Sequence, residues 1–241
     1  MKVSEYILFT IGKLPKGFIF TYTDFNTEQN NKEAIIKALN RLVASGKIEK
    51  LSKGKFYKPE TTPFGKLQPK QSQIVKDLLE TNGKVTGYLT GFSIYNQLGL
   101  TTQISNTIQV GKNVVRPKFK RERYTISFIK QKNTITKENI PMLQLLDAIR
   151  YIKKIPDTTI ISACKRLLAI INKMSQKDKK TLVRLALKYP PATRALLGAL
   201  LETTQNYNLT EALRKSLNPI TTYKLSGVNS VLPVAEKWNI K

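Results

Sequence analysis

The sequence predicts an α+β protein that is mainly helical and has two domains. Three observations support this prediction. Short alternating apolar runs lie in the first half of the chain, apolar residues recur at helical spacing in the second half, and a proline-rich segment follows the first alternating runs. We expect a first domain over 1–60, a linker over 61–69 and a second domain over 70–241, of which 70–157 is mixed α/β and 158–241 helical. A chain of 241 residues is long enough for two cores of this kind.

The first sixty residues predict elements in the order of a winged helix-turn-helix. Pro15 and Gly17 end the first helix, and Thr21 is suited to cap the second. The expected elements are a helix over 3–14, a short edge strand over 18–20, a brief helix over 21–25, a turn over 26–29, a long helix that begins at Asn30 and a hairpin over 48–57.

The long helix is the element around which this domain is organised. Its apolar residues recur at i, i+3, i+4, i+7 and i+8 from Ile35 and form one stripe. Asn30 with Glu33 is a variant of the capping box, and Gly46 is suited to the left-handed residue that ends a helix. The core that we expect around this stripe consists of Ile7, Ile11, Phe20, Phe25, Ile35, Leu39, Leu42, Ile48 and Phe56.

Polar and basic side chains occupy the helix face opposite this stripe, and lysines recur along the hairpin after it. Such a helix face fits the major groove of DNA, and a basic hairpin is suited to hold phosphates. We therefore predict contacts with duplex DNA by Asn31, Lys32, Lys37, Asn40, Arg41, Lys50, Lys53 and Lys55. The alternative is an amphipathic helix that packs on a hairpin whose lysines are only solvated.

The next part of the chain predicts helices and strands together. The expected elements are a helix over 71–81, a short helix over 92–98, strands over 107–110 and 114–115 around a turn at 111–113, and a strand over 124–129.

A strongly basic run lies between the last two of these strands. It contains a second candidate basic surface, which consists of Arg116, Lys118, Lys120, Arg121 and Arg123. A basic hairpin here could hold nucleic acid, and a solvated face of a sheet would give the same pattern.

From Pro141 onward the pattern is helical. We expect helices over 141–153, 158–174, 176–189, 192–203 and 209–217, followed by a less regular tail over 223–241.

The charge of the chain favours a polyanionic partner. Lys and Arg number 41 against 16 Asp and Glu, which gives a formal net charge of +25 spread over the whole sequence. Such a field makes binding to nucleic acid strong and dependent on salt. We find no apolar run of about 20 residues that could span a bilayer and no signal-peptide pattern. We therefore expect a cytoplasmic protein without a membrane partner.

The residue types that most enzymes need are rare in this chain. It has no histidine and one cysteine, Cys164. This excludes Ser-His-Asp and Cys-His nucleophiles and a cysteine-rich zinc site. No Asp-x-Asp pair would hold magnesium for nucleotidyl transfer, and no glycine-rich loop would hold phosphates. We expect no catalytic residues, no metal and no cofactor, and therefore not an enzyme.

Two parts of the sequence resemble the AbiEi-type antitoxins of bacterial type IV toxin–antitoxin systems, which act in abortive infection. The first is the N-terminal unit that ends in Gly46-Lys47-Ile48-Glu49-Lys50-Leu51-Ser52-Lys53-Gly54-Lys55-Phe56-Tyr57. The second comprises Tyr88-Leu89-Thr90-Gly91-Phe92, Leu98-Gly99-Leu100-Thr101-Thr102-Gln103 and the segment over 145–157.

This resemblance implies a transcriptional repressor that binds inverted repeats in its own promoter through the winged domain. It also implies that the second domain counteracts a cognate nucleotidyltransferase toxin in phage defence, typically without a stable complex. The family's binding positions are basic and polar residues of the winged unit, which match Lys37, Asn40, Arg41, Lys53 and Lys55 here.

Three other functions stay open on the sequence. They are an RNA-binding or ribosome-associated protein, a transcription factor without antitoxin activity and an enzyme that acts on nucleic acid. For the second domain, direct binding of a toxin and indirect opposition to it are both open.

Overall fold

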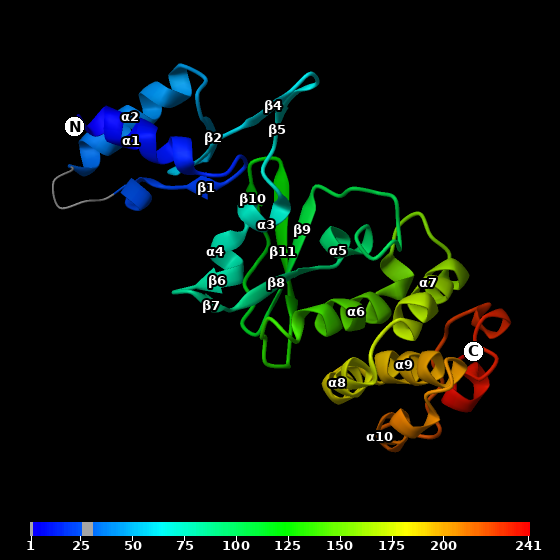
Figure 1. Ribbon diagram of the computed structural model, residues 1–241. Helices are drawn as coiled ribbons and strands as arrows, with labels where there is room; N and C mark the ends of the chain where they lie inside the picture. The colour runs from blue at the N-terminus through cyan, green and yellow to red at the C-terminus, as the bar shows by residue number, and fades with distance from the viewer. Residues whose placement is uncertain (1, 26–30) are drawn as a thin grey trace. The chain divides into compact units, whose positions relative to one another are not determined.

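The computed structural model describes residues 2–25 and 31–241, and it divides the chain into two compact units (Figure 1). The first unit comprises Met1–Asp77 together with Lys120–Arg123, and the second comprises Leu78–Phe119 and Tyr124–Lys241. The fold is α+β, with helices and several small sheets. The first unit therefore continues well beyond residue 60, where we expected its domain to end.

The first part of this unit contains the expected helices and strands. Strands β1, β3 and β2 form an antiparallel sheet in that order. The elements are α1 (Val3–Lys13), β1 (Ile19–Phe20), the 3₁₀ helix η1 (Tyr22–Phe25), α2 (Lys32–Ala44), β2 (Glu49–Ser52) and β3 (Lys55–Tyr57).

The predicted core of this unit is confirmed with one addition and one exception. Ala38 joins the buried cluster, and Leu42 is half-buried and packs against it. The Phe20 ring lies at the centre, with its centroid 5.4 Å from that of Phe25 and 6.3 Å from that of Phe56. The buried residues are Ile7, Ile11, Phe20, Phe25, Ile35, Ala38, Leu39, Ile48 and Phe56.

Helix α2 has an asparagine cap at its start and a left-handed glycine after its end. Asn31 is the N-cap, and its side-chain oxygen accepts a hydrogen bond from Glu33 N at 2.9 Å. Asn30, which we expected to be the cap, lies outside the described residues, as does the turn expected over 26–29. Gly46 follows the helix with φ of 70° and turns the chain toward β2, as predicted.

The segment over 61–69 is a β-hairpin and not a linker. Strands β4 (Glu60–Thr62) and β5 (Gly65–Leu67) pair antiparallel, and the hairpin projects from the unit (Figure 1). The Thr62 hydroxyl donates to Gly65 O at 2.9 Å, which closes the turn at Phe64. Lys66 forms an ion pair with Glu49 of β2. The prolines lie at the turn and outside the paired strands, so they do not interrupt the ladder.

The prediction of a single helix over 71–81 is wrong. Two short helices, α3 (Gln71–Ile74) and α4 (Lys76–Leu79), are separated at Val75, and the chain then forms a small hairpin of β6 (Glu80–Thr81) and β7 (Lys84–Val85). Val75 has φ of −112° and ψ of 18°, outside the helical range.

The main sheet has four strands in the order β10-β11-β9-β8. Strand β9 pairs antiparallel with β8 and parallel with β11. The strands are β8 (Gly87–Thr90), β9 (Thr107–Lys112), β10 (Phe119–Arg121) and β11 (Tyr124–Lys130).

The predictions of a turn at 111–113 and of a strand over 114–115 are both wrong. Gly111 lies inside β9 and pairs with Tyr88 of β8. The Tyr88 ring covers Gly111 so closely that a Cβ atom there would collide with it. The glycine is therefore a place where a large ring packs on backbone and not a turn signal.

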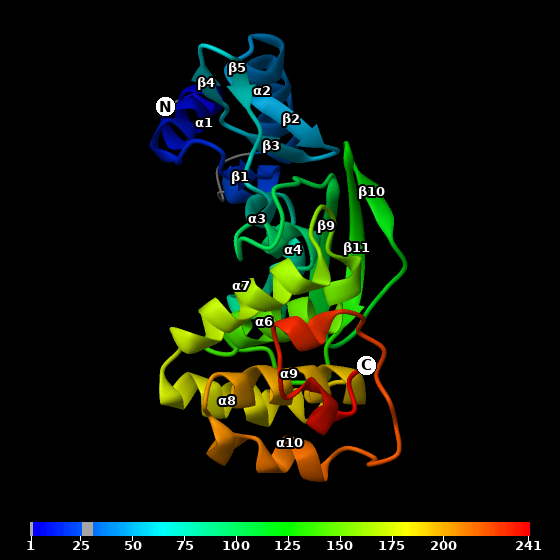
Figure 2. The same ribbon diagram turned by 90° about the vertical axis from the view of Figure 1, so that its right-hand side faces the viewer.

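Helices make up the remainder of the second unit (Figure 2). Helix α6 packs against β8 and against α8 and α9, and α7 packs on α9. Their bounds are α5 (Phe92–Tyr95), α6 (Ile140–Arg150), η2 (Ile152–Lys154), α7 (Ile160–Asn172), α8 (Gln176–Ala186), α9 (Pro191–Thr203), η3 (Tyr207–Leu209), α10 (Glu211–Lys215), η4 (Val228–Ser230) and η5 (Ala235–Trp238).

One hydrophobic core joins buried residues of the second unit from Tyr88 to Ile240. Residue 158 is therefore not a boundary between two cores. The C-terminal residues join this core because the ring of Trp238 packs over Gly198 of α9. Among the described residues, no helix combines the length and the apolar character that crossing a bilayer requires.

Candidate nucleic-acid interface

Three predicted contact residues lie on the exposed face of α2. Lys37, Asn40 and Arg41 are spaced i, i+3 and i+4, so their side chains lie close together on one side of the helix. All three are exposed, while Ile35 and Leu39 on the opposite side are buried. In the described part of the chain, none of the three takes part in a salt bridge.

The hairpin of β2 and β3 presents its lysines unequally. Lys50 and Lys53 are exposed. Lys55 forms an ion pair with Asp77 at 2.9 Å, and only 22% of its side chain is exposed. The sequence grouped these lysines together, but the fold gives one of them a carboxylate partner.

Asp77 also holds Arg121, so one carboxylate engages two of the predicted contact residues. The Arg121 guanidinium donates to both Asp77 oxygens, at 2.8 and 2.9 Å, and its side chain is 10% exposed. Burial raises the pKa of Asp77, but hydrogen bonds and charges from Arg121 and Lys55 outweigh this effect and hold the pKa below its ordinary value. Arg121 therefore has a structural role in the first unit.

The first two predicted contacts at the start of α2 also have partners within the fold. The Asn31 side chain caps the helix, as described above. The Lys32 ammonium lies 4.9 Å from the centroid of the Tyr22 ring. Both residues are exposed, so they lie on the surface with these partners.

The basic run over 116–123 does not form one surface. It is divided between the two units after Phe119. The Arg116 guanidinium lies over the stacked rings of Phe119 and Phe128, 4.5 and 5.4 Å from their centroids. Lys118, Lys120 and Arg123 are exposed. The run therefore combines residues that stabilise the fold with residues on the surface.

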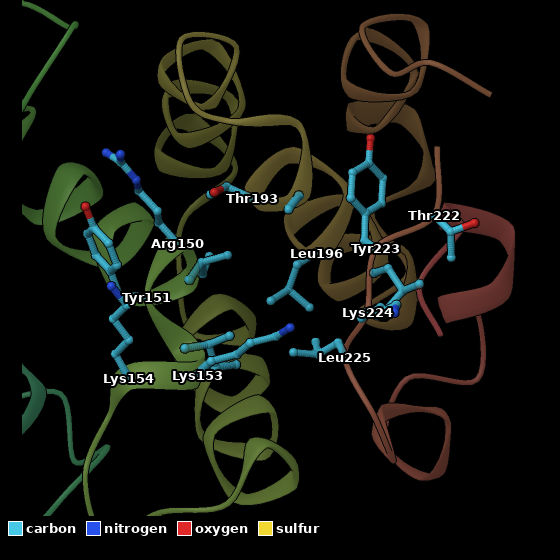
Figure 3. A pocket seen from close by; sticks show the side chains of 14 residues that line it. Arg150, Tyr151, Lys153, Lys154, Thr193, Leu196, Thr222, Tyr223, Lys224 and Leu225 are labelled. Carbon is cyan, nitrogen blue, oxygen red and sulfur yellow. The ribbon is translucent and has the colours of Figure 1, made fainter. Parts of the chain in front are cut away.

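The second unit has a concave basic region that the sequence analysis missed. One hollow of about 350 Å³ lies between η2, the start of α9 and the segment over 222–225 (Figure 3). In that view Lys153 extends toward Leu225, and Arg150 points away from Leu196. A second hollow of about 700 Å³ lies between the end of β11, α6 and the connection from α8 to α9.

The two hollows adjoin at Arg150, which lines both, and together we call them the basic groove. Neither hollow has an aspartate or a glutamate among its lining residues. The cations of the basic groove are Lys130, Lys132, Arg150, Lys153, Lys154, Lys188, Arg194 and Lys224. They are dispersed over almost one hundred residues, so no run in the sequence marks them. Lys153-Lys154 and Lys130-Gln131-Lys132 are the short local signals that the sequence contains.

A buried polar network lies behind the basic groove. Asp147 of α6 is fully buried and accepts hydrogen bonds from Tyr88 and Thr90, both at 2.7 Å, and from Tyr189 at 2.9 Å. Gln131 donates to the hydroxyls of Tyr88 and Tyr189, at 2.8 and 2.7 Å. Because Gln131 and Tyr189 also line the larger hollow, this network fixes part of its wall.

Burial in this network shifts the pKa values of its carboxyl group and of its two phenol groups. Burial raises the pKa of Asp147, although the three hydroxyl donors and the nearby Arg150 oppose the shift. Burial, together with the charge of Asp147, also raises the pKa of Tyr88 and of Tyr189, so both tyrosines stay protonated. The Tyr-Leu-Thr-Gly motif and the motif with Asp147 thus meet in the core of the second unit.

The comparisons with known proteins identify a family and a fold. No curated protein matches the chain. The structure is similar to the crystal structure of the RV2827C protein from Mycobacterium tuberculosis, with a TM-score of 0.60 and 11% sequence identity, over 92% of this chain and 83% of that chain. At this identity the likeness concerns the fold alone. A family model matches residues 6–178, which include most of the first unit and the second unit as far as α8. The chain therefore belongs to the family of unknown function DUF6088.

Proposed function

We propose that the first unit is a winged helix-turn-helix that binds duplex DNA. The observation that carries this proposal is the exposed cluster of Lys37, Asn40 and Arg41 on α2, next along the chain to a hairpin with exposed Lys50 and Lys53. Helix α2 would enter the major groove as the recognition helix, and the hairpin of β2 and β3 would be the wing.

The contacts divide by their chemistry. Asn40 can form two hydrogen bonds with adenine, and Arg41 can do so with guanine, so these two residues would select the sequence. Lys37, Lys50 and Lys53 would neutralise phosphates, which gives affinity without sequence preference. Lys55 would make a weaker contribution because Asp77 already pairs with its ammonium group.

The wider role that we propose is that of a cytoplasmic antitoxin which represses its own operon. The support is the resemblance of the N-terminal unit and of the Tyr-Leu-Thr-Gly block to AbiEi-type antitoxins. The cognate partner would be a nucleotidyltransferase toxin, which the second unit would counteract. A transcription factor without antitoxin activity would share the DNA-binding part of this proposal.

The DNA-binding part can be tested by titrating labelled promoter duplex at several salt concentrations. Each phosphate contact contributes about 0.9 to the slope of log affinity against log salt. Lys53→Ala should lower this slope by about 0.9, while Lys177→Ala, which removes an exposed charge from α8, should leave it unchanged. An equal slope for Lys53→Ala and the wild type would exclude Lys53 from the interface.

Base selection needs a separate experiment. Selection from a random duplex library should return a motif for the wild-type protein and a motif with one relaxed position for Arg41→Ala, at a cost of about 1–3 kcal/mol for the preferred base. Identical motifs would show that Arg41 does not contact a base.

The antitoxin part requires the product of the neighbouring gene. Co-expression of a toxic neighbour with the full chain should restore growth, and the Arg41→Ala variant should rescue equally well because the second unit supplies this activity. If the neighbouring gene product is not toxic, or if the full chain fails to restore growth, the antitoxin assignment is wrong while DNA binding can still hold.

A further inference from the structure

We propose that the basic groove of the second unit binds single-stranded nucleic acid through its phosphates. This site is separate from the duplex-binding face of α2, and the inference does not depend on that function. It follows from the charge, the shape and the aromatic lining of the two hollows that adjoin at Arg150.

The charge of the basic groove is the first reason. Its cations have no acidic neighbour among the lining residues, and in the described part of the chain none of them forms a salt bridge. The first unit differs, because Asp77 engages two of its basic residues and Glu49 engages another. Cations that converge without a carboxylate in an ion pair repel one another, and a polyanion relieves this repulsion.

Arg194 gives a more specific indication. It lies in the first turn of α9 and lines the larger hollow. Its Nε is buried, and the described part of the chain provides no hydrogen-bond acceptor for it. A buried donor without an acceptor is unfavourable, and a phosphate oxygen that reaches the Arg194 guanidinium from the hollow would supply the missing acceptor.

The aromatic lining favours nucleotides over other anions. Tyr151 and Tyr223, both half-buried, line the smaller hollow, whereas Tyr189 of the larger hollow is buried with its hydroxyl in the Asp147 network. Tyr151 is flanked by Arg150 and Lys154, whose charged groups lie 4.9 and 5.5 Å from its ring centroid. Partly exposed aromatic rings with cations nearby are typical of sites that stack unpaired bases while cations follow the backbone.

The shape favours a single strand over a duplex. Hollows of about 350 and 700 Å³ are of the size that holds one small organic molecule each, so they admit individual nucleotides. Duplex DNA is bound in the opposite way, since a protruding helix or hairpin enters its groove. Two adjoining hollows suit a strand whose neighbouring nucleotides are unstacked.

The experiment measures binding of a labelled 12-nucleotide RNA to the full chain by fluorescence anisotropy. The groove variant carries Arg150→Gln, Lys188→Gln and Arg194→Gln. The control variant carries Lys165→Gln, Lys177→Gln and Lys180→Gln, which remove the same charge from exposed positions of α7 and α8. A matched titration uses DNA of the same sequence, and circular dichroism checks that both variants are folded.

The groove variant should bind the RNA at least tenfold more weakly, and the control variant should stay within about twofold of the wild type. The salt slope should fall by about 2 in the groove variant, because each phosphate contact on a single strand contributes about 0.7. Binding of promoter duplex should be equal for the groove and control variants, which separates this site from the duplex-binding face.

Three results would overturn the proposal. The first is equal loss in the groove and control variants, which would show that net charge alone attracts the strand. The second is competition by polyglutamate as strong as by unlabelled RNA, which would indicate an acidic protein partner. The third is saturation by inorganic triphosphate at micromolar concentration, which would indicate a small phosphorylated ligand. Stronger binding of RNA than of DNA would refine the proposal by implicating the 2′-hydroxyl.

Discussion

The two basic surfaces of this protein are built in different ways. On the first unit, basic residues protrude from α2 and from the β2–β3 hairpin, and several others of the unit are paired with Asp77, Glu49 or Glu60. On the second unit, the cations line hollows that contain no acidic residue. A protruding surface suits the groove of a duplex, and a concave one suits a strand that enters it.

The comparison shows that net charge alone does not identify a binding surface. Both units are rich in lysine and arginine, and the most basic run in the sequence, over 116–123, does not form one surface. What matters is which cations the fold leaves without a carboxylate and whether they converge. The following predictions test how far the two units, and their surfaces, differ.

The largest effect that we expect concerns the buried network behind the basic groove. Asp147→Ala removes the acceptor of three hydroxyls and should destabilise the second unit by about 3–5 kcal/mol, since each buried unsatisfied group costs about 1–3 kcal/mol. Trp238 is the one tryptophan of the sequence and is buried in this unit, so its fluorescence during urea unfolding reports on the second unit alone.

Asp147→Asn is the matched control, and it adds a pH dependence. Because the folded-state pKa of Asp147 is raised, its contribution to stability is complete below the ordinary aspartate pKa of about 4 and is lost as the pH rises through the folded value. The wild type should therefore lose stability relative to the Asn variant as the pH rises above about 4. A constant difference between the two would show that Asp147 titrates normally.

A glycine-to-alanine substitution, made once in each unit, should have a smaller effect on stability. Gly198→Ala in α9 would place a Cβ against the ring of Trp238 and should destabilise the second unit by about 1–3 kcal/mol. Gly12→Ala in α1 meets nothing within 4 Å and should stabilise the first unit by about 0.5 kcal/mol. Urea unfolding followed by Trp238 fluorescence measures the first change, and thermal melting of backbone circular dichroism measures both.

These two substitutions also test whether the units are independent. Gly198→Ala should leave duplex binding unchanged, since it affects only the packing of the second unit. If Gly198→Ala weakened duplex binding as much as Arg41→Ala, the separation of the two surfaces would be wrong.

The smallest effect should come from Asp77. Asp77→Asn removes the charge that pairs with Lys55 and should tighten duplex binding about threefold, with an increase of up to about 0.9 in the salt slope if Lys55 then contacts a phosphate. Titration of promoter duplex at several salt concentrations measures both changes. An unchanged slope would place Lys55 outside the interface.

The same carboxyl group gives the first unit a pH dependence of opposite sign. The pKa of Asp77 is lowered in the folded state, so its stabilising contribution is complete above the ordinary aspartate pKa and is lost as the pH falls through the folded value. Acid unfolding of the first unit should therefore shift to higher pH in Asp77→Asn.

The sequence was most informative where local patterns set the structure. Local apolar patterns predicted eight of the nine buried residues of the first core, because the period of a helix or strand fixes which side chains share a face. Prediction from the sequence was wrong at Gly111, at Val75 and for the hairpin over 61–69. At Gly111 the ring of Tyr88 on another strand decided the conformation, and no local pattern contains that information.

The amino-acid sequence by itself determined the α+β class, most of the helices, most of the first core and the excess of positive charge. Only the tertiary structure decided which charges are available for binding. Asp77 engages Lys55 and Arg121, which lie far from it and from each other in the chain, while the basic groove gathers cations from 130 to 224. The physical reason is that helical and strand periodicity act over a few residues, whereas ion pairs and hollows form between residues that meet only when the chain folds.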